Sequence, residues 1–170
     1  MRRIVIALTV LGAATLSPAT NADDPPKRSV ELQVLDRFVG TWDLKVTAKV
    51  SGQKENSHEG VETRKWSRGG SFVLFENNAP PEFHMLLTYD SNAKEYTGFL
   101  MSGPSRLPLS GTWDERTATM TFKGTYPDGG KLLSKHRFID KNNAESSSTI
   151  SNAEGKVVVE LTHKQTRREK

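Results

Sequence analysis

The sequence predicts an all-β protein: an antiparallel up-and-down meander barrel of about eight to ten strands, with one short N-terminal helix closing one end. From Trp42 onward, apolar and polar residues alternate in short segments that recur about every ten residues. Turn-forming stretches such as "RGG", "YPDGG" and "NAEG" separate most of these segments. A meander of this kind must close or pair its edges, so a barrel is favoured and a two-sheet sandwich is the competing architecture.

Residues 1–22 have the layout of a secretory signal peptide. Arg2 and Arg3 precede an apolar stretch, Ile4 to Leu16, that is short for a membrane span. Thr20 and Ala22 are small residues at the −3 and −1 positions of a cleavage site. We therefore expect an exported bacterial protein, periplasmic or secreted, with no stable membrane insertion after cleavage. The alternative is an uncleaved anchor.

Composition excludes several function classes. The chain has no cysteine, which rules out thiol catalysis, thiolate zinc sites and iron–sulfur clusters. Its formal net charge is +4, and two of the basic residues belong to the leader. No basic stripe is interleaved with aromatic residues, so we expect no nucleic-acid partner.

The region after the leader divides into a linker, residues 23–28, and one domain, residues 29–170. The linker "DDPPKR" is expected to be extended because each Pro disfavours helix in the residue before it. Ser29 can cap a short helix, and Gly40 can end it. The apolar residues of this helix recur at helical spacing: Leu32, Leu35, Phe38 and Val39.

The first strand is expected to begin at the closed end of the barrel. Gly40 lets the chain turn from helix to strand, and Trp42 is the first inward residue. Its indole is large enough to fill that end and can donate its N–H to a backbone carbonyl. A basic side chain from the last strand, Arg167 or Arg168, can lie over the ring as a cation–π contact.

Nine further segments are expected to form strands. In order they are "HEGVETRKW", "SFVLFE", "FHMLLTYD", "KEYTGFLM", "LPLSGTWD", "TATMTFKG", "KLLSKHRFI", "AESSSTIS" and "KVVVELTH".

Several of these stretches resemble a known family. "FVGTWDL" after a short helix is similar to the Gly-x-Trp signature of the calycins, the lipocalin and fatty-acid-binding-protein superfamily. "RKWSRGGSFVLFE", "LLTYDSNAKEYTGF" and "LSGTWDERTATMTF" resemble the bacterial calycin-like family known as domain of unknown function 1579. The resemblance covers about Leu32 to Arg167. It implies a lipocalin-like barrel and frequent export, and it transfers no catalytic residue.

Strand parity identifies a candidate polar interior. His136 and His163 fall on apolar strand faces, and the inward face of "AESSSTIS" carries Ser146 and Ser148. Hydroxyls and an imidazole inside a barrel suit a ligand with polar groups. The alternative is an edge strand exposed on both sides, with His136 bonded to a neighbour. The candidate pocket residues are Trp66, Tyr96, Met120, Ser134, His136 and Ser148.

The preferred function is a non-enzymatic barrel that binds a small, partly apolar or lipid-like ligand. The alternatives are a filled barrel acting as an envelope interaction module, and a hydrolase or isomerase with His136 as its base. Among the carboxylates, only Glu62 shares a strand face with Arg64 and Trp66, as a residue for acid/base catalysis could. An outward salt-bridged ladder explains this pattern equally well.

No catalytic residue or metal site is assigned, because the histidines lack local metal-pair spacing. No cofactor is expected. Haem is an alternative: the nitrobindins, related ten-stranded barrels, bind haem through a His near the C-terminus, and "VELTHKQTRR" places His163 at a loosely similar position in the last expected strand. The sequence does not indicate an oligomeric state.

Overall fold

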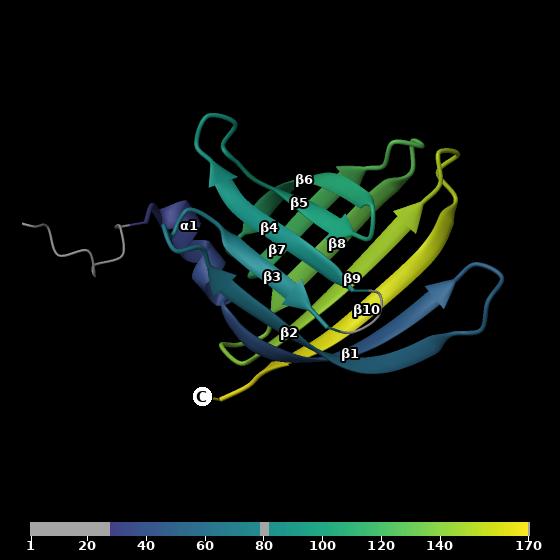
Figure 1. Ribbon diagram of the computed structural model, residues 1–170, viewed down its shortest axis with the longest axis horizontal. Coiled ribbons are helices and arrows are strands. Elements are labelled where there is room, and N and C mark those ends of the chain that lie inside the picture. Colours follow the sequence, from purple (N-terminus) through teal and green to yellow (C-terminus); the bar gives the residue numbers. More distant parts are fainter. Residues whose placement is uncertain (1–27, 79–81, 170) are drawn as a thin grey trace, which may run out of the picture.

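The computed structural model describes residues 28–78 and 82–169 (Figure 1). The expected signal peptide and nearly all of the expected linker lie outside the described residues. Ten antiparallel strands form one closed barrel in which each strand pairs with the next in sequence, and the first pairs with the last. The predicted up-and-down barrel is therefore confirmed.

The strands are short and joined by tight links. Their bounds are β1 Gly40–Val50, β2 Asn56–Trp66, β3 Val73–Asn77, β4 Phe83–Asp90, β5 Glu95–Ser102, β6 Ser105–Asp114, β7 Thr119–Thr125, β8 Lys131–Phe138, β9 Asn143–Ser151 and β10 Val157–Arg167.

The predicted helix is present and short. It comprises α1, Val30–Val34, followed by a 3₁₀ turn, η1, Leu35–Arg37. The Ser29 hydroxyl accepts a hydrogen bond from the Leu32 backbone N–H at 3.3 Å, as an N-cap does. This segment lies across one end of the barrel (Figure 1). Leu35 and Phe38 are fully buried in the hydrophobic core there.

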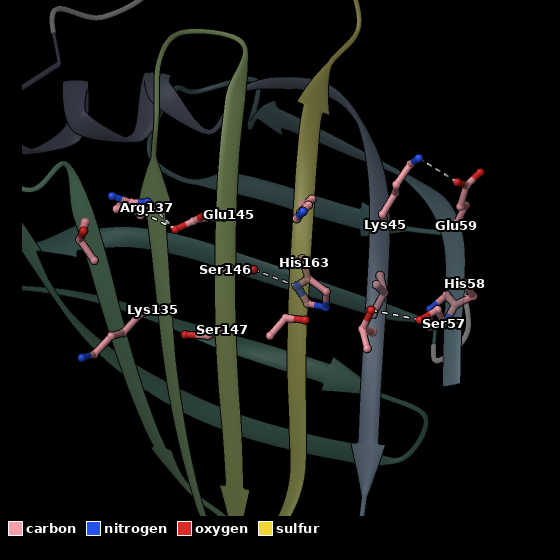
Figure 2. A pocket seen from close by; sticks show the side chains of 15 residues that line it. Lys45, Ser57, His58, Glu59, Lys135, Arg137, Glu145, Ser146, Ser147 and His163 are labelled. Carbon is pink, nitrogen blue, oxygen red and sulfur yellow. Dashed lines mark hydrogen bonds and ion pairs between the residues drawn. The ribbon is translucent and has the colours of Figure 1, made fainter. Parts of the chain in front are cut away.

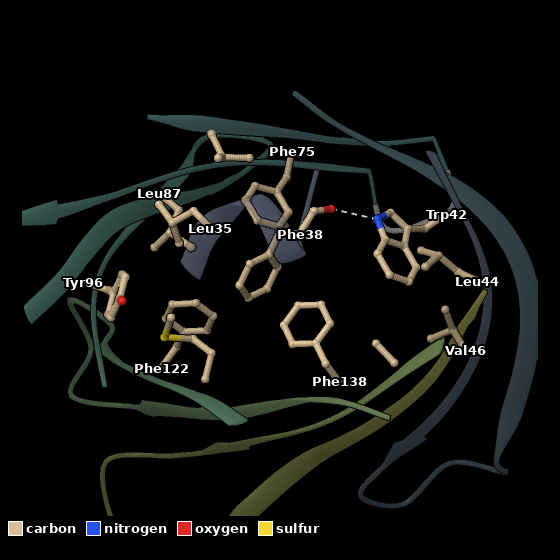
Figure 3. Packing of buried hydrophobic residues seen from close by; sticks show 13 residues of the cluster. Leu35, Phe38, Trp42, Leu44, Val46, Phe75, Leu87, Tyr96, Phe122 and Phe138 are labelled. Carbon is tan, nitrogen blue, oxygen red and sulfur yellow. Dashed lines mark hydrogen bonds between the residues drawn. The ribbon is translucent and has the colours of Figure 1, made fainter. Parts of the chain in front are cut away.

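Trp42 fills the closed end. Its side chain is 0% exposed, and its indole Nε1 donates to the Phe38 carbonyl at 2.7 Å (Figure 3). The Phe38 ring meets Phe75 and Phe138 edge-on, with centroids 5.6 and 4.9 Å apart. Each buried ring of this kind contributes about 1.5–3 kcal/mol through burial alone. The helix and the barrel therefore share one hydrophobic core.

Arg167 covers the outer side of the Trp42 ring. Its guanidinium carbon lies 4.3 Å from the indole centroid. It donates to the carbonyl oxygens of Val39, Arg37 and Lys141. A Cβ at Gly40 would lie 2.7 Å from Arg167 Nη1, so the glycine makes room for this arginine. The absence of a side chain at Gly40 therefore leaves the space that Arg167, at the end of the last strand, occupies.

Apolar residues from β4 to β9 line the interior beyond this core. Leu107, Leu109 and Leu132 form a second buried cluster, and partly buried residues pack against it: Met85, Leu100, Tyr126 and Ile150. No helix among the described residues is long and apolar enough to cross a membrane.

Candidate functional site

A buried ion pair lies inside the barrel on β2. Glu62 and Arg64 are two residues apart, so both point inward, and Arg64 Nη2 donates to Glu62 Oε2 at 2.8 Å. The two side chains are only 5% and 2% exposed. The structure therefore decides the alternative left open by the sequence: this pair faces the interior and is not an outward ladder.

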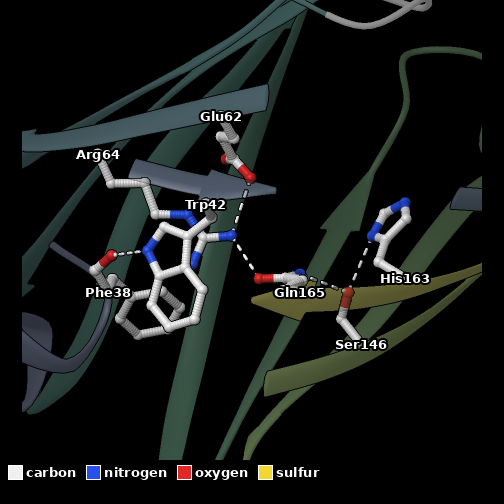
Figure 4. A network of polar contacts seen from close by, with 7 residues as sticks. All are labelled: Phe38, Trp42, Glu62, Arg64, Ser146, His163 and Gln165. Atoms are coloured by element: carbon white, nitrogen blue, oxygen red, sulfur yellow. Dashed lines mark hydrogen bonds and ion pairs between the residues drawn. The ribbon is translucent and has the colours of Figure 1, made fainter. Parts of the chain in front are cut away.

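Hydrogen bonds continue from this ion pair across the inner wall, forming what we call the polar chain (Figure 4): Glu62, Arg64, Gln165, Ser146 and His163. Arg64 Nη2 also donates to Gln165 Oε1 at 2.6 Å. Gln165 Nε2 donates to Ser146 Oγ at 3.2 Å, and Ser146 Oγ lies 2.9 Å from His163 Nδ1. The polar chain thus links β2, β10 and β9.

Aromatic rings surround the Arg64 guanidinium. Its central carbon lies 5.0 Å from the Trp42 centroid, 5.3 Å from that of Phe75 and 5.8 Å from that of Phe38. Its Nε and Nη1 atoms are buried without a hydrogen-bond partner among the described residues. The ring faces offer only weak compensation for these N–H groups.

His136 lies beside this group without a hydrogen bond to it. Its ring centroid is 4.8 Å from those of Phe38 and Phe138, and its buried Nε2 has no partner among the described residues. Burial holds the pKa of His136 well below its usual 6.5, and Arg64 and then His163 lower it further. His136 is therefore a neutral imidazole at neutral pH.

His163 occupies the end of the polar chain nearer the open mouth and is half-buried. Burial lowers the pKa of His163, Glu62 opposes that shift, and Arg64 and His58 add to it. Strand register explains these neighbours, because Val46 on β1 pairs with His58 on one side and His163 on the other. Among the described residues, no three His, Asp or Glu side chains are grouped to hold a metal ion.

Three of the predicted pocket residues adjoin the polar chain. Ser148 Oγ donates to Ser134 Oγ at 2.8 Å, and each is a register partner of the other across β8 and β9. His136 pairs in the same way with Ser146, and Ser146 pairs with His163. These side chains form one polar wall on neighbouring strands.

The other three predicted pocket residues pack in the closed-end core. Trp66 Nε1 donates to Asp36 at 2.7 Å, under the Arg28 guanidinium. The Tyr96 hydroxyl donates to the Glu31 carbonyl at 3.0 Å. Met120 is 0% exposed in the same hydrophobic cluster as Phe38. They therefore hold the helix and its end of the barrel and lie apart from the polar chain.

Glu62, Arg64 and Gln165 were not among the predicted site residues. Parity with Trp66 placed the first two on one face, yet Val61 on the opposite face is also apolar. Alternation on this strand therefore did not tell inside from outside. Gln165 follows His163 by two residues in the last strand, which was a usable signal.

A groove of about 830 Å³ lies over the same strands and is lined mostly by their outward side chains (Figure 2). Its outward side chains include two exposed ion pairs, Lys45 with Glu59 at 3.4 Å and Arg137 with Glu145 at 2.6 Å. Hydroxyls from β1 and β2 meet between them, with Thr47 Oγ1 3.0 Å from Ser57 Oγ. This groove is charged and hydroxyl-lined, and it borders Ser146 and His163 of the polar chain, whose hydrogen-bonded side chains line the inner wall.

A closed ten-stranded barrel capped by a helix, with Trp42 at its closed end, defines a calycin-like protein. The chain matches the model of the family described as protein of unknown function (DUF1579) over residues 27–167. It belongs to that family. No curated protein matches the chain.

Solved structures share the fold at low identity. Rv2717c from M. tuberculosis has a TM-score of 0.64 and 13% identity, covering 84% of this chain and 100% of that one. The S-type phycobiliprotein lyase CPES from Guillardia theta has a TM-score of 0.58 and 13% identity, with coverages of 85% and 95%.

A DUF3598-family protein of unknown function from Nostoc punctiforme has a TM-score of 0.58 and 8% identity. The match covers 89% of this chain, which spans 53% of the length of that protein. At these identities the likeness shows the fold alone.

Proposed function

We propose that this protein is an exported, non-enzymatic barrel that binds a small, partly apolar ligand in its interior. The observation that carries the proposal is the polar chain, which ends at the half-buried His163 inside the barrel. Burying the Glu62–Arg64 pair costs desolvation that an apolar pair would avoid. Stability therefore does not explain why Glu62 and Arg64 are buried, whereas binding of a ligand at the polar wall does.

The interior combines polar and apolar residues, which favours an amphipathic ligand. Strands β8–β10 carry Ser134, Ser146 and His163, and the apolar cluster of Leu107, Leu109 and Leu132 adjoins them on β6 and β8. Half-buried inward residues toward the open end are accessible to solvent, including Leu161 and His163. Ligand sites of soluble proteins combine apolar walls with a few placed polar groups in the same way.

Binding is favoured over catalysis by the surroundings of Ser146 and His136. Ser146 pairs with strands on both sides, so its flanking backbone N–H groups serve the ladder and do not form an oxyanion hole. His136 contacts aromatic rings and has no acid or hydroxyl bonded to it among the described residues. A general base needs a proton donor within reach.

Likeness to the Guillardia theta protein supports a role for the interior only at the level of fold, since a barrel of this shape serves there as a phycobiliprotein lyase. Export rests on the leader sequence, which lies outside the described residues.

Native mass spectrometry of the full-length gene product purified from its exported fraction tests this proposal. We expect a non-covalent adduct on the wild type that is lost in His163→Ala. The adduct should persist in His84→Ala, because His84 is exposed on the outer face of β4. A bare protein mass for the wild type, or equal occupancy in both variants, contradicts interior binding at the polar wall.

Haem is the second candidate ligand, favoured by one observation. Ser146 engages Nδ1 of the inward His163, which leaves Nε2 without a hydrogen bond to any described residue. Axial histidines are commonly oriented by such a second contact, in which the other ring nitrogen donates its proton. Haem binding would therefore require His163 to donate Nδ1–H to Ser146, the tautomer opposite to the one inferred for the ligand-free ring. Titration with haemin should then give a Soret band that His163→Ala abolishes; an unperturbed free-haemin spectrum removes this candidate.

A further inference from the structure

Arg64 sets the direction of the hydrogen bonds in the polar chain. A guanidinium donates and never accepts, so the Gln165 atom that it contacts at 2.6 Å is the carbonyl oxygen. The amide nitrogen of Gln165 therefore faces Ser146 and donates to Oγ at 3.2 Å. Because Arg64 can only donate, the oxygen and nitrogen of the Gln165 amide are assigned without the usual ambiguity.

The direction continues to His163. Ser146 Oγ accepts from Gln165 and keeps one proton to donate, and His163 Nδ1 lies 2.9 Å away. Burial lowers the pKa of His163, so the ring is neutral and has one acceptor and one donor nitrogen. Ser146 Oγ has a second lone pair and could accept from Nδ1 as well, but its own proton would then have no acceptor among the described residues. Donation from Ser146 to Nδ1 satisfies that proton, which makes Nδ1 the acceptor and places the ring proton on Nε2.

A second pair of side chains on the polar wall also leaves one hydrogen-bond donor without an acceptor. Ser134 and Ser148 share one hydrogen bond of 2.8 Å, and no other bond to either hydroxyl occurs among the described residues. Whichever hydroxyl donates, the proton of the other has no acceptor there. The polar wall thus presents two spare donors, His163 Nε2–H and a serine O–H, beside the apolar cluster formed by Leu107, Leu109 and Leu132.

We propose that the polar wall selects a ligand whose head carries a hydrogen-bond-accepting oxygen, such as a ketone, ester or carboxylate, joined to an apolar body. This inference rests on the proposed interior binding and names the chemistry that it recognises. A head that can only donate, such as a primary ammonium, leaves both donors unpaired and is rejected. Arg64 and Gln165 act as positioning residues, because they fix the tautomer of His163.

The first test is the tautomer itself. Long-range ¹H–¹⁵N correlation spectra of the imidazoles should show His163 neutral and protonated on Nε2. In Gln165→Leu, which keeps the size of the side chain and removes the amide, the spectrum should move toward a mixture of tautomers. A wild-type ring protonated on Nδ1, or a tautomer unchanged in Gln165→Leu, overturns the positioning role.

The second test uses three probes of equal chain length: decanoate, 2-decanone and decylammonium. Calorimetric titration should show the two oxygen-bearing probes binding at least about tenfold more tightly than decylammonium, the factor that one to two lost hydrogen bonds produce. His163→Gln, whose amide N–H can replace Nε2–H, should retain this preference, and His163→Leu should lose it.

Outcomes of the probe titration separate the inference from the function on which it rests. Equal affinity for all three probes overturns acceptor selectivity and leaves interior binding standing. No affinity for any probe, alongside a native adduct in the mass measurement, also overturns the inferred ligand class and leaves binding intact. Loss of both the adduct and probe binding overturns the proposed function as well.

Discussion

Arg64 carries a full charge in a buried position, where removing the charge from water costs free energy. Its side chain is 2% exposed, one carboxylate faces it, and the remaining N–H groups point among aromatic rings. A buried ion pair often contributes no more than well-packed apolar residues would, yet breaking one by removing a single partner is strongly destabilising. Coupling between Glu62 and Arg64 should therefore be large even if their joint contribution is small.

A double-mutant cycle measures this coupling. Glu62→Gln and Arg64→Met should each lower the free energy of unfolding by about 3–5 kcal/mol, because each leaves its partner charged and unpaired. The double variant should lose much less than the sum. Urea denaturation gives all four values.

The exposed pair Lys65–Glu76 is the matched control for that cycle, with its two partners 3.0 Å apart on the outer face of β2 and β3. Its cycle should give a coupling of only about 0–1 kcal/mol. Strict additivity for Glu62 and Arg64 would contradict their assignment as a buried pair.

His136 should make the fold sensitive to acid. Its pKa is lowered in the fold by burial, Arg64 and His163, whereas in the unfolded chain it is about 6.5. Below that value the unfolded chain binds a proton that the folded one refuses, so stability falls as pH drops, by up to about 1.4 kcal/mol per pH unit.

Replacing His136 by Phe removes this proton uptake. The new ring would lie between Phe38 and Phe138, which already contact the imidazole. Unfolding free energies of His136→Phe should therefore decline less steeply than those of the wild type between about pH 7 and pH 5. The residual slope belongs partly to His163, whose pKa is also lowered. Parallel profiles for the two proteins would contradict a buried neutral His136.

The elements of the barrel were predictable where one physical signal dominates. Alternation from Trp42 to Val50 has large apolar residues on one face only, and that face is the interior. The turn chemistry of "RGG" and "YPDGG" separates strands whose existence is therefore clear. The helix was also predicted, because Ser29 and Gly40 bracket its apolar spacing.

The site was less predictable because its strands carry mixed signals. Ser146 and His163 were placed inward by parity, and the structure brings them together. On β2 both faces hold apolar and charged residues, so the inward Glu62 and Arg64 could not be told from a surface ladder. Their environment depends on Trp42 and Phe75, which come from other strands, and a single-strand pattern does not contain that information.

Close contact between β4 and β5 depends on Gly98. A Cβ at this position would lie 1.9 Å from the Leu86 carbonyl oxygen, so any side chain forces the two strands apart. Gly98→Ala should lower the unfolding free energy by about 1–3 kcal/mol, the usual effect of overpacking.

Gly69→Ala is the control, because the nearest atom to its added Cβ is the Ser71 hydroxyl at 3.7 Å. Thermal denaturation of the two variants should show a large drop in Tm for the first and little change for the second. Equal Tm values would argue against the described β4–β5 packing.

At the scale of the whole molecule, the barrel is closed twice. Pairing of β1 with β10 closes the sheet, and the helix with Trp42 and Arg167 closes one end. Two adjacent arginines test the second closure, since Arg167 binds three carbonyls and the indole while Arg168 makes an exposed pair with Asp43.

Arg167→Ala should lower the unfolding free energy by about 3 kcal/mol, because hydrogen bonds to charged groups contribute about 1.5–3 kcal/mol each and cation–π stacking adds to them. Arg168→Ala should cost less than about 1 kcal/mol. Guanidinium denaturation monitored by Trp fluorescence compares the two. A larger loss for Arg168→Ala would contradict the closure by Arg167.

Closure at one end leaves the other end to admit a ligand, with the polar wall on β8–β10 and the apolar cluster of Leu107, Leu109 and Leu132 beside it. The competing surface is the outer groove over the same strands, whose floor includes Thr47 and Thr162. Inside and outside therefore differ in which methyl groups a bound molecule would touch.

Intermolecular nuclear Overhauser effects from bound decanoate distinguish the two faces most directly. We predict contacts from the alkyl chain to the methyl groups of Leu109, Leu132 and Ile150 inside the barrel. Contacts confined to the methyl groups of Thr47 and Thr162 would place the ligand in the outer groove and contradict interior binding.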